Sequence, residues 1–499
     1  MLKTTHTMTH HLSQGWQTLR HRLGGATPPA HPSLSAFAAD PDRLPRWVRR
    51  DPVAMRWLDV LSPLDWDALP PRPSSPHPLL PTLPYAPLLA AYLIKIHEPI
   101  PSMSRLRAYL VEHPALTWML GFPLVRSSAT PWGWDPGASV PSHRHLMRML
   151  RTLPNPLLQG LLDTTVARLR QALPPDCGFG RTISLDTKHI LAWVKENNPK
   201  AYVDGDTRFD KTVQPAGDPD CRLGCKRRRN QGQTPPDDPP TPGHDPVPAR
   251  SVKVGTWYWG YASGVVATKV RDWGEFVLAE LTQPFNRADV TYFAPLMADT
   301  TRRLGFHPWY GAFDAAFDAW YVYEAFHSEE HDGFAAVPRV ARTYSKSAMT
   351  FDDEGLPRCA AGLPMPLRST FWAKTSAVPH EKGRYGCPLN GGQEDCPVHH
   401  ARWPKGGCVT TIPTSIGARL RHQLDRESAA YKGVYAQRTA TERINSQAVA
   451  LGIERPKLRN GQAIANYNTL LYCVINLRAL QRIRAGHPAV SSPSDSTPE

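Results

Sequence analysis

The stretch R-T-I-S-L-D-T-K at residues 181–188 decides the fold, because it has the pattern of a strand that ends at an acidic residue, Asp186. The stretch W-Y-G-A-F-D at residues 309–314 repeats that pattern and ends at Asp314. Side chains at the ends of strands gather at one edge of an α/β sheet, where active sites form. We therefore expect Asp186 and Asp314 to lie side by side.

The segments between and beyond these aspartates indicate a mixed α/β sheet. Residues 252–262 and 264–270 are predicted to be adjacent strands joined by a turn at Ser263-Gly264. A strand, a helix, a second helix and a last strand are expected, in this order, at residues 276–281, 288–304, 318–326 and 334–340. This order predicts a mixed sheet flanked by helices, with an antiparallel hairpin at one edge.

A third carboxylate, Glu442, closes the stretch Y-A-Q-R-T-A-T-E at residues 435–442. This stretch has a helical pattern, and offsets of three and seven residues would place Tyr435, Arg438 and Glu442 on one helix face. Hard cations such as Mg²⁺ take oxygen ligands from a few acidic residues, and paired ions stabilise both the attacking and the leaving oxygen. The three carboxylates are therefore candidate ligands for Mg²⁺ or Mn²⁺ in an enzyme that cuts nucleic acid.

Some of these assignments leave alternatives open. Asp318, four residues after Asp314, is a rival for the second acidic position, although Asp314 is favoured because it ends the strand. Asn286 and Asp289 would serve as cap and first-turn charge of the helix predicted at residues 288–304, or else lie near the site. Each of the three carboxylates could also be an ordinary turn or helix-surface residue.

The charge of the chain favours a polyanionic partner. The 499 residues include 58 Lys and Arg against 44 Asp and Glu, a net charge of +14, with a pI near 9.5. Residues 419–484 hold 12 basic and 4 acidic side chains, so more than half of the net charge lies there. This balance is typical of proteins that bind nucleic acid, although a basic run by itself could be an ordinary solvated surface.

The N-terminus and the cysteines indicate the compartment. The first residues lack the apolar run of a signal peptide, and the most apolar stretch, residues 87–96, is too short to span a bilayer. A soluble, cytoplasmic protein with reduced cysteines and no membrane partner is therefore expected. Four cysteines fall in one segment and are candidate ligands of a structural Zn²⁺, although their spacing lacks paired CxxC motifs, which favours free structural cysteines: Cys359, Cys387, Cys396 and Cys408.

Composition and periodicity divide the chain into six segments. They are an irregular N-terminal region (1–78), a helical domain that could bind DNA (79–176), the first part of the catalytic core (177–342), a β-rich insertion (343–416), the helices that carry and follow Glu442 (417–484) and a disordered tail (485–499). Inside the core, the Pro-rich stretch 227–250 is predicted to be a disordered surface loop, because it cannot bury enough apolar surface to fold.

Together these residues resemble a known family, the DDE transposases of bacterial insertion sequences, whose core is RNase H-like. The most specific match is the Y-x2-R-x3-E signature, met by Tyr435, Arg438 and Glu442. The supporting matches are S-L-D-T-K at 184–188, Q-P-F-N-R-A-D at 283–289 and G-A-F-D-A-A-F-D-A at 311–319. The long gap before the acidic residue of the signature is similar to that of members with a β-rich insertion. The resemblance covers roughly residues 80–484.

The resemblance implies a fold, an activity and partners. The fold would be an N-terminal all-helical domain followed by an RNase H-like mixed sheet with a small β-rich insertion. The activity would be that of a transposase, which binds the ends of an insertion sequence, cuts DNA strands and joins the 3′ ends to target DNA. The three carboxylates would hold Mg²⁺ or Mn²⁺, and the partners would be double-stranded DNA and a second copy of the chain on that DNA.

One position departs from the family signature. Members with the full signature carry Lys seven residues after the acidic residue, where this chain has Val449. Lys457 or Arg459 would then supply the phosphate contact, and Tyr435 and Arg438 would contribute to DNA binding. The sequence leaves open a nuclease that cuts without joining, a catalytically inactive DNA-binding descendant, and a ribonuclease on the same core.

Overall fold

The chain divides into two compact units. Unit 1 comprises Met1–Pro175, Asp272–Val277 and Ser446–Glu499, and unit 2 comprises Asp176–Arg271 and Leu278–Asn445. The computed structural model describes residues 31–73, 82–205, 207–226, 256–339, 350–376, 378–390, 395–398 and 403–486. The stretch 227–250 and the tail beyond residue 486, both predicted to be disordered, lie outside the described residues.

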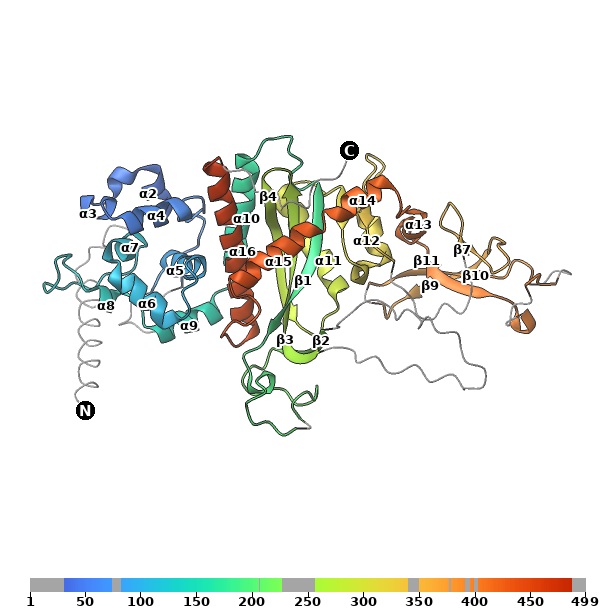
Figure 1. Cartoon of the computed structure of the whole chain (residues 1–499), viewed down its shortest axis with the longest axis horizontal. Helices are drawn as coiled ribbons and strands as arrows, with labels where there is room; N and C mark the ends of the chain where they lie inside the picture. Colours follow the sequence, from blue (N-terminus) through green and yellow to red (C-terminus); the bar gives the residue numbers. More distant parts are fainter. Residues whose placement is uncertain are drawn as a thin grey trace, which may run out of the picture. The chain divides into compact units, whose positions relative to one another are not determined.

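Unit 1 is built from helices that start at short polar caps. Its helices are α2 (Leu34–Ala39), η1 (Pro41–Arg43), α3 (Arg46–Arg49), α4 (Pro52–Leu61), α5 (Tyr85–His97), α6 (Met103–Glu112), α7 (Pro114–Met119), α8 (Pro136–Ser139), α9 (His143–Thr152), α10 (Asn155–Ala172) and α16 (Gly461–Arg484) (Figure 1). Ser33, Asp51, Ser102 and Ser142 each accept a hydrogen bond from a backbone N–H of the first turn. These bonds satisfy donors that the helix itself leaves unpaired, and so fix where four of the helices begin.

The prediction that residues 1–78 are irregular is wrong for the described residues 31–73. These residues form α2, η1, α3 and α4. Their buried side chains, Phe37 and Trp57 among them, complete the apolar core of unit 1. The many prolines suggested irregular structure, since proline inside a helix interrupts it. A proline such as Pro52, however, stands in the first turn of its helix, where its missing N–H removes no hydrogen bond.

Helix α16 is central to unit 1. Its side chains are buried almost all round, and it packs against α5, α9 and α10. Two buried asparagines on it are satisfied: Asn466 donates to the carbonyls of Leu150 and Leu153, and Asn476 donates to the hydroxyl of Thr165. A helix that is apolar on all sides must be covered on all sides. Residues from 446 onward therefore belong to the helical unit, not with the rest of the predicted segment 417–484.

Unit 2 contains a mixed sheet, which confirms the α/β class. Its strands are β1 (Thr182–Leu191), β2 (Arg222–Lys226), β3 (Thr256–Val270), β4 (Gly274–Pro284), whose residues up to Val277 fall in unit 1, β5 (Tyr310–Ala312) and β6 (Phe334–Ala336). The strands lie in the order β2-β3-β1-β5-β6, and β4 also pairs with β3. Strand β1 runs antiparallel to β3 and parallel to β5, and β5 runs parallel to β6.

The turn predicted at Ser263-Gly264 is wrong, because β3 runs through both residues without a break. In the antiparallel register, Thr187 of β1 lies opposite Gly264 and Lys188 lies opposite Ser263. A Cβ atom on Gly264 would come within 2.4 Å of the ring of Tyr292, so the glycine is needed for close packing. The hairpin is made instead by residues 271–273, between β3 and β4.

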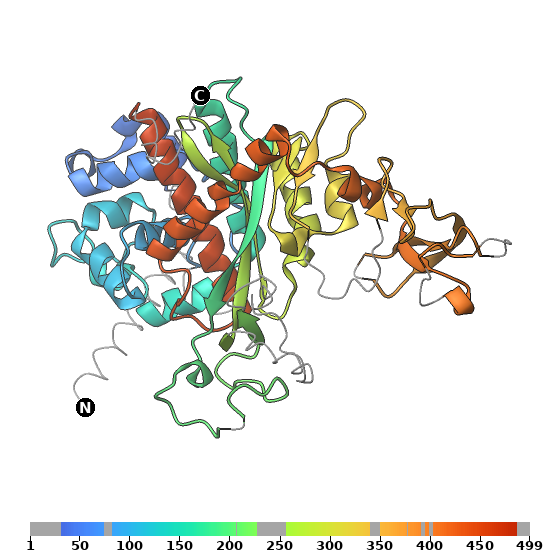
Figure 2. The same cartoon turned by 45° about the vertical axis from the view of Figure 1, so that its right-hand side comes forward.

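Short helices and an insertion complete unit 2. The helices are η2 (Lys195–Asn197), η3 (Asp289–Tyr292), α11 (Phe293–Leu304), η4 (Ala315–Phe317), α12 (Trp320–Ala325), α13 (Ile416–Gln423), α14 (Ala429–Ala436) and α15 (Thr439–Ala450), whose last residues fall in unit 1. The insertion contains β7 (Thr350–Phe351), β8 (Pro357–Arg358), β9 (Leu367–Ala373), β10 (His380–Gly386), η5 (Trp403–Lys405) and β11 (Val409–Pro413). In Figure 2 its orange strands form a sheet separate from the green strands β1 and β3. Among the described residues, no helix is long and apolar enough to cross a membrane.

Candidate active site

Asp186 lies in β1, and Asp314 lies just beyond the end of its parallel neighbour β5. Both aspartates are the same number of residues past a pair of strand residues that lie opposite each other. Ser184 of β1 pairs with Ala312 of β5, and each aspartate stands two residues further along its chain. The backbone of Asp314 is still extended, so a step of two residues returns both side chains to the same face. Since neighbouring strands lie about 4.8 Å apart, the two carboxylates share one site.

Strand β1 does not end at Asp186, contrary to the prediction from its sequence. It continues to Leu191 because β3 pairs with it along that whole length. Strand β5 stops at Ala312, so its pairing with β1 ends at Ser184. Asp186 therefore stands in the middle of a well-supported strand, at the point where the neighbouring strand on the other side ends.

Both carboxyl groups have a raised pKa. Burial raises the pKa of Asp186 to about 6; the N–H of Thr187 and the charge of Arg438 oppose this rise, while Asp314 and Asp289 add to it. Burial is also the main cause of the raised pKa of Asp314, with Asp289 contributing and the N–H of Ala316 opposing. Buried negative charges that repel one another are an environment that favours a bound cation.

Asp289 is the acidic residue that the sequence placed least well. Its Oδ1 accepts a hydrogen bond of 2.7 Å from the hydroxyl of Thr187, the residue after Asp186. Its charge acts on both Asp186 and Asp314, so it belongs to the site, and it also stands in the first turn of η3, as predicted. Asn286 is not the predicted cap, because η3 starts at Asp289 and its N-cap position is Ala288. The resemblance of residues 283–289 to a transposase segment was the one sequence signal for this placement.

Glu442 is close to this site but is paired with an arginine. It forms an ion pair with Arg438, whose charge also acts on Asp186 and Asp314. The side chain of Glu442 is half exposed. Three residues later on α15, the Nδ2 atom of Asn445 donates to Oδ2 of Asp186 over 3.1 Å. Both Figure 1 and Figure 2 show α15 lying across β1, and this hydrogen bond ties the two elements together.

The signature residues do not lie on one continuous helix, contrary to the prediction. Tyr435 is in α14, which ends at Ala436, whereas Glu442 is in α15, which begins at Thr439. Arg438 lies in the break between the two helices. From there its guanidinium group pairs with Glu442 and also lies over the ring of Tyr435, 5.9 Å from the ring centre. The three residues are therefore neighbours in space through the arginine.

Asp318, the rival second carboxylate, is fully buried and satisfied by the protein itself. Both of its oxygens accept hydrogen bonds from Arg421, at 2.6 and 2.5 Å, and its Oδ1 also accepts one from the hydroxyl of Tyr323. It is not among the charges that act on Asp186. Its position is that of a structural ion pair.

The predicted metal ligands are not preassembled. In the part of the chain that the structure describes, no three His, Cys, Asp or Glu side chains are arranged so that they could hold a metal ion. Among the candidate carboxylates, Glu442 is held in an ion pair with Arg438. Asp186 and Asp314 nevertheless fit a divalent cation, since they are hard oxygen donors in a buried anionic site.

Three of the four insertion cysteines gather around a small core. The pKa of the Cys408 thiol is raised to about 11, mainly by burial, with Cys387 and Cys359 contributing. Cys359 and Tyr385 belong to that core, against which Cys408 packs, while Cys396 is buried elsewhere in the same insertion. The zinc site stays a prediction, which the zinc content of the purified protein would test.

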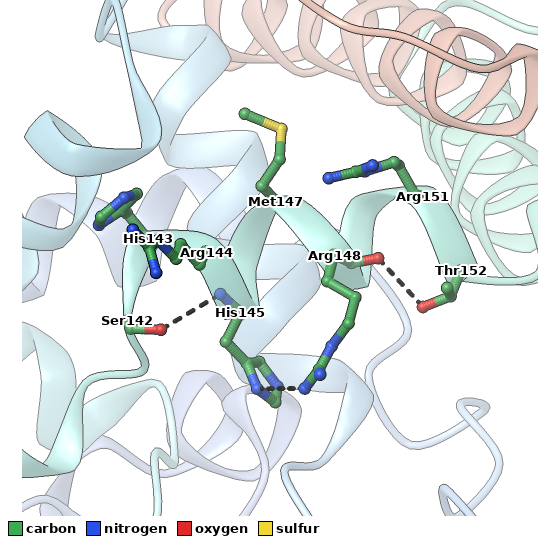
Figure 3. Close-up of a pocket in the computed structure, with 8 residues that line it drawn as sticks. All are labelled: Ser142, His143, Arg144, His145, Met147, Arg148, Arg151 and Thr152. Atoms are coloured by element: carbon green, nitrogen blue, oxygen red, sulfur yellow. Dashed lines mark hydrogen bonds between the residues drawn. The ribbon is translucent and has the colours of Figure 1, made fainter. Parts of the chain in front are cut away.

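Helix α9 has a basic exposed face, separate from the candidate carboxylate site. Arg144, Arg148 and Arg151 are exposed at helical spacing, while Leu146 and Leu150 are buried on the opposite face. Figure 3 shows the arginines around an open pocket that no acidic side chain lines, with Arg148 donating a hydrogen bond of 3.0 Å to Nδ1 of His145. The prediction that residues 79–176 bind DNA gains specific candidate residues on this helix.

The remaining predicted phosphate contacts lie in the loop before α16. Lys457 and Arg459 are both exposed there, and Val449, at the position where the family signature has Lys, is also exposed. The three residues belong to unit 1, whereas Arg438 belongs to unit 2.

No family model matches the chain, and a search of curated proteins finds no match either.

Proposed function

We propose that this chain is a DDE transposase, a metal-dependent enzyme that cuts DNA strands and joins them to target DNA. The observation that carries the proposal is the pair Asp186 and Asp314. Two acidic residues 128 positions apart in the chain share one level of a mixed sheet, and both have a raised pKa. Perturbed carboxyl groups gathered from separate strands are typical of catalytic sites.

The order of the strands supports an RNase H-like core. Strands β1, β3 and β4 come in this order along the chain, with β2 between β1 and β3, and β3 pairs with β1, β2 and β4. Strands β5 and β6 are added on the other side of β1, parallel to it. The first acidic residue is then on the central strand and the second follows the adjacent one. This arrangement is the one that the resemblance to transposases implies.

The chemistry would depend on divalent cations. When bound, Mg²⁺ or Mn²⁺ would activate the attacking hydroxyl group and offset the charge that develops on the phosphodiester. Asp186 and Asp314 would supply carboxylate oxygens from neighbouring strands, and Asp289 would add a third negative charge. Asp186 is deprotonated above about pH 6, so near neutral pH it is an anionic ligand even before the cation arrives.

Glu442 would complete the site after leaving its present partner. Its carboxylate forms an ion pair with Arg438, whose positive charge also acts on Asp186 and Asp314. An arginine is a strong, two-pronged ligand for phosphate. In the proposed reaction a DNA phosphate takes Arg438, and Glu442 turns towards the aspartates.

DNA would be held by cations outside the carboxylate site. The exposed arginines of α9 line a pocket that no acidic side chain lines, and Lys457 and Arg459 are exposed in the loop before α16. Phosphate contacts supply most of the affinity for DNA and little of its sequence preference. Both sets of basic residues belong to unit 1.

A cleavage assay with Asp186→Asn tests the proposed function. The substrate is duplex DNA taken from both flanks of the gene, incubated with the full chain and Mg²⁺. Loss of one ligand should lower strand cleavage by roughly three orders of magnitude, while DNA binding measured in Ca²⁺ stays near wild type. Asp299→Asn, which changes an exposed carboxylate on α11, is the matched control and should cleave normally.

Two outcomes would overturn the proposal. Cleavage by Asp186→Asn at more than a few per cent of the wild-type rate would remove the catalytic assignment. Cleavage by wild type without transfer of the 3′ ends into a target plasmid would identify a nuclease in place of a transposase.

A further inference from the structure

Asn445 is a buried amide that touches the candidate site but is no part of the signature. It lies three residues after Glu442 on α15, an offset that places both side chains on the same helix face. The residue is 7% exposed. Its Nδ2 donates to Oδ2 of Asp186, and the backbone N–H of Thr187 donates to Oδ1 of the same carboxylate. Both oxygens of Asp186 are thus fixed in orientation.

The other end of this amide has no partner. The Oδ1 atom of Asn445 is buried and accepts no hydrogen bond from any described residue. Buried polar atoms almost always find a partner, so an orphan acceptor beside buried carboxylates indicates a group that is present only when the site is filled. A water in the shell of a divalent cation has the required chemistry, because it is a strong donor and Mg²⁺ usually keeps several such waters.

We propose that Asn445 is a positioning residue of the metal site, which holds Asp186 through Nδ2 and accepts a hydrogen bond from a cation-bound water through Oδ1. This inference rests on the proposed function and names how the site prepares for its ion. An amide suits the role better than a carboxylate, since a negative charge at this position would repel Asp186 and could not donate to it. The same helix would then supply one movable ligand, Glu442, and one fixed support.

The test measures metal binding and not only activity. Titration of the full chain with Mn²⁺, followed by the electron paramagnetic resonance of the free ion, gives the affinity of the site that Asp186→Asn removes. Asn445→Ala should weaken that site by roughly 10- to 100-fold, the usual effect of losing a group that supports a metal ligand. Ser446→Ala, an exposed neighbour on α15, should bind Mn²⁺ like wild type.

A second variant keeps the test decisive if Asn445→Ala folds poorly. Asn445→Asp keeps an oxygen acceptor and loses the donor, so it should bind Mn²⁺ more tightly than Asn445→Ala while its metal-free form melts at a lower temperature than wild type. Equal, wild-type affinity in both variants would overturn the inference and leave the proposed function intact. Equally weak binding in both would overturn the role of Oδ1. If wild type and Asp186→Asn bind Mn²⁺ identically, the metal site itself, and with it the proposed function, is wrong.

Discussion

Asp314 and Asp318 are four residues apart, yet unit 2 surrounds them in opposite ways. Asp318 is enclosed with Arg421, which donates to both of its oxygens. Asp314 receives one backbone N–H bond, from Ala316, and its charged neighbours include Asp289. A buried carboxylate that the protein neutralises with its own arginine is a structural ion pair, whereas a buried carboxylate beside another acidic side chain is a candidate cation ligand.

The largest expected difference between the two aspartates is in catalysis. Asp314→Asn should reduce DNA cleavage by roughly three orders of magnitude, because it removes a metal ligand. Asp318→Asn should leave the rate per folded molecule within about tenfold of wild type, because Asp318 touches no reacting group. Single-turnover cleavage, normalised to the folded fraction, measures both. A reversed order would identify Asp318 as the second catalytic carboxylate.

The second expected difference between the two aspartates is in stability, where replacing Asp318 has the larger effect. Asp318→Asn should destabilise unit 2 by about 3–5 kcal/mol, since it leaves Arg421 largely buried without its counter-charge. Asp314→Asn should be neutral or slightly stabilising without metal, because it removes a repelling charge. Thermal unfolding in the presence of a chelator compares the two.

A double replacement separates the charge effect from packing. Changing Asp318 and Arg421 together to apolar residues of similar size should recover much of the lost stability. No recovery would mean that the hydrogen bond from Tyr323 to Asp318, not the ion pair, carries the stabilisation.

A further prediction concerns Asp186, the strand neighbour of Asp314, and the change of stability with pH. The pKa of Asp186 is raised to about 6 by burial, so the folded protein holds this proton more tightly than the unfolded chain does. The resulting stability is fully present below about pH 4 and is lost as pH rises through about 6, by up to about 3 kcal/mol. The free energy of unfolding of wild type minus that of Asp186→Asn, measured at pH 4 and at pH 7.5 without divalent ions, isolates this contribution. Added Mg²⁺ should restore the stability at pH 7.5; if it has no effect, the raised pKa reflects burial alone.

The smallest expected effect concerns the cations that would hold DNA. Replacing Arg144, Arg148 and Arg151 of α9 with Ala should reduce the slope of log affinity against log salt by up to about three units. The double change of Lys457 and Arg459 should reduce it by up to about two. Fluorescence anisotropy with one duplex at several salt concentrations gives both slopes, and an unchanged slope would show that the basic residues concerned are only solvated surface.

The sequence predicted well which segments form strands and helices, and predicted poorly where those strands and helices end. The strands that lead to Asp186 and Asp314 were predicted from their local sequence, since a strand pattern depends only on neighbouring residues. The end of β1 and the course of β3 through Gly264 were missed, because long-range pairing with another strand decides both. For the same reason the break between α14 and α15, where Arg438 lies, could not be seen in a helical pattern.

The candidate site was predictable only where a residue type has a chemical signature. Carboxylates suggest cations, so Asp186 and Asp314 were candidates at once. Asp289 was predicted first as a helix-turn charge, because its contact with Thr187 spans 102 positions. Asn445 was missed, since a neutral amide inside a helix gives no sign of the carboxylate, 259 positions away, to which it donates.

The chain order of α16 has a consequence for synthesis. This helix fills the centre of unit 1 between α5, α9 and α10, yet it is translated after the whole of unit 2. A nascent chain must therefore keep the apolar faces of these earlier helices apart from one another until the last helix leaves the ribosome. Contacts between segments more than 300 positions apart are also expected to slow the folding of unit 1. A chain cut short before residue 461 would leave the helical unit without its centre, so only completed molecules would present the basic face of α9 on a folded support.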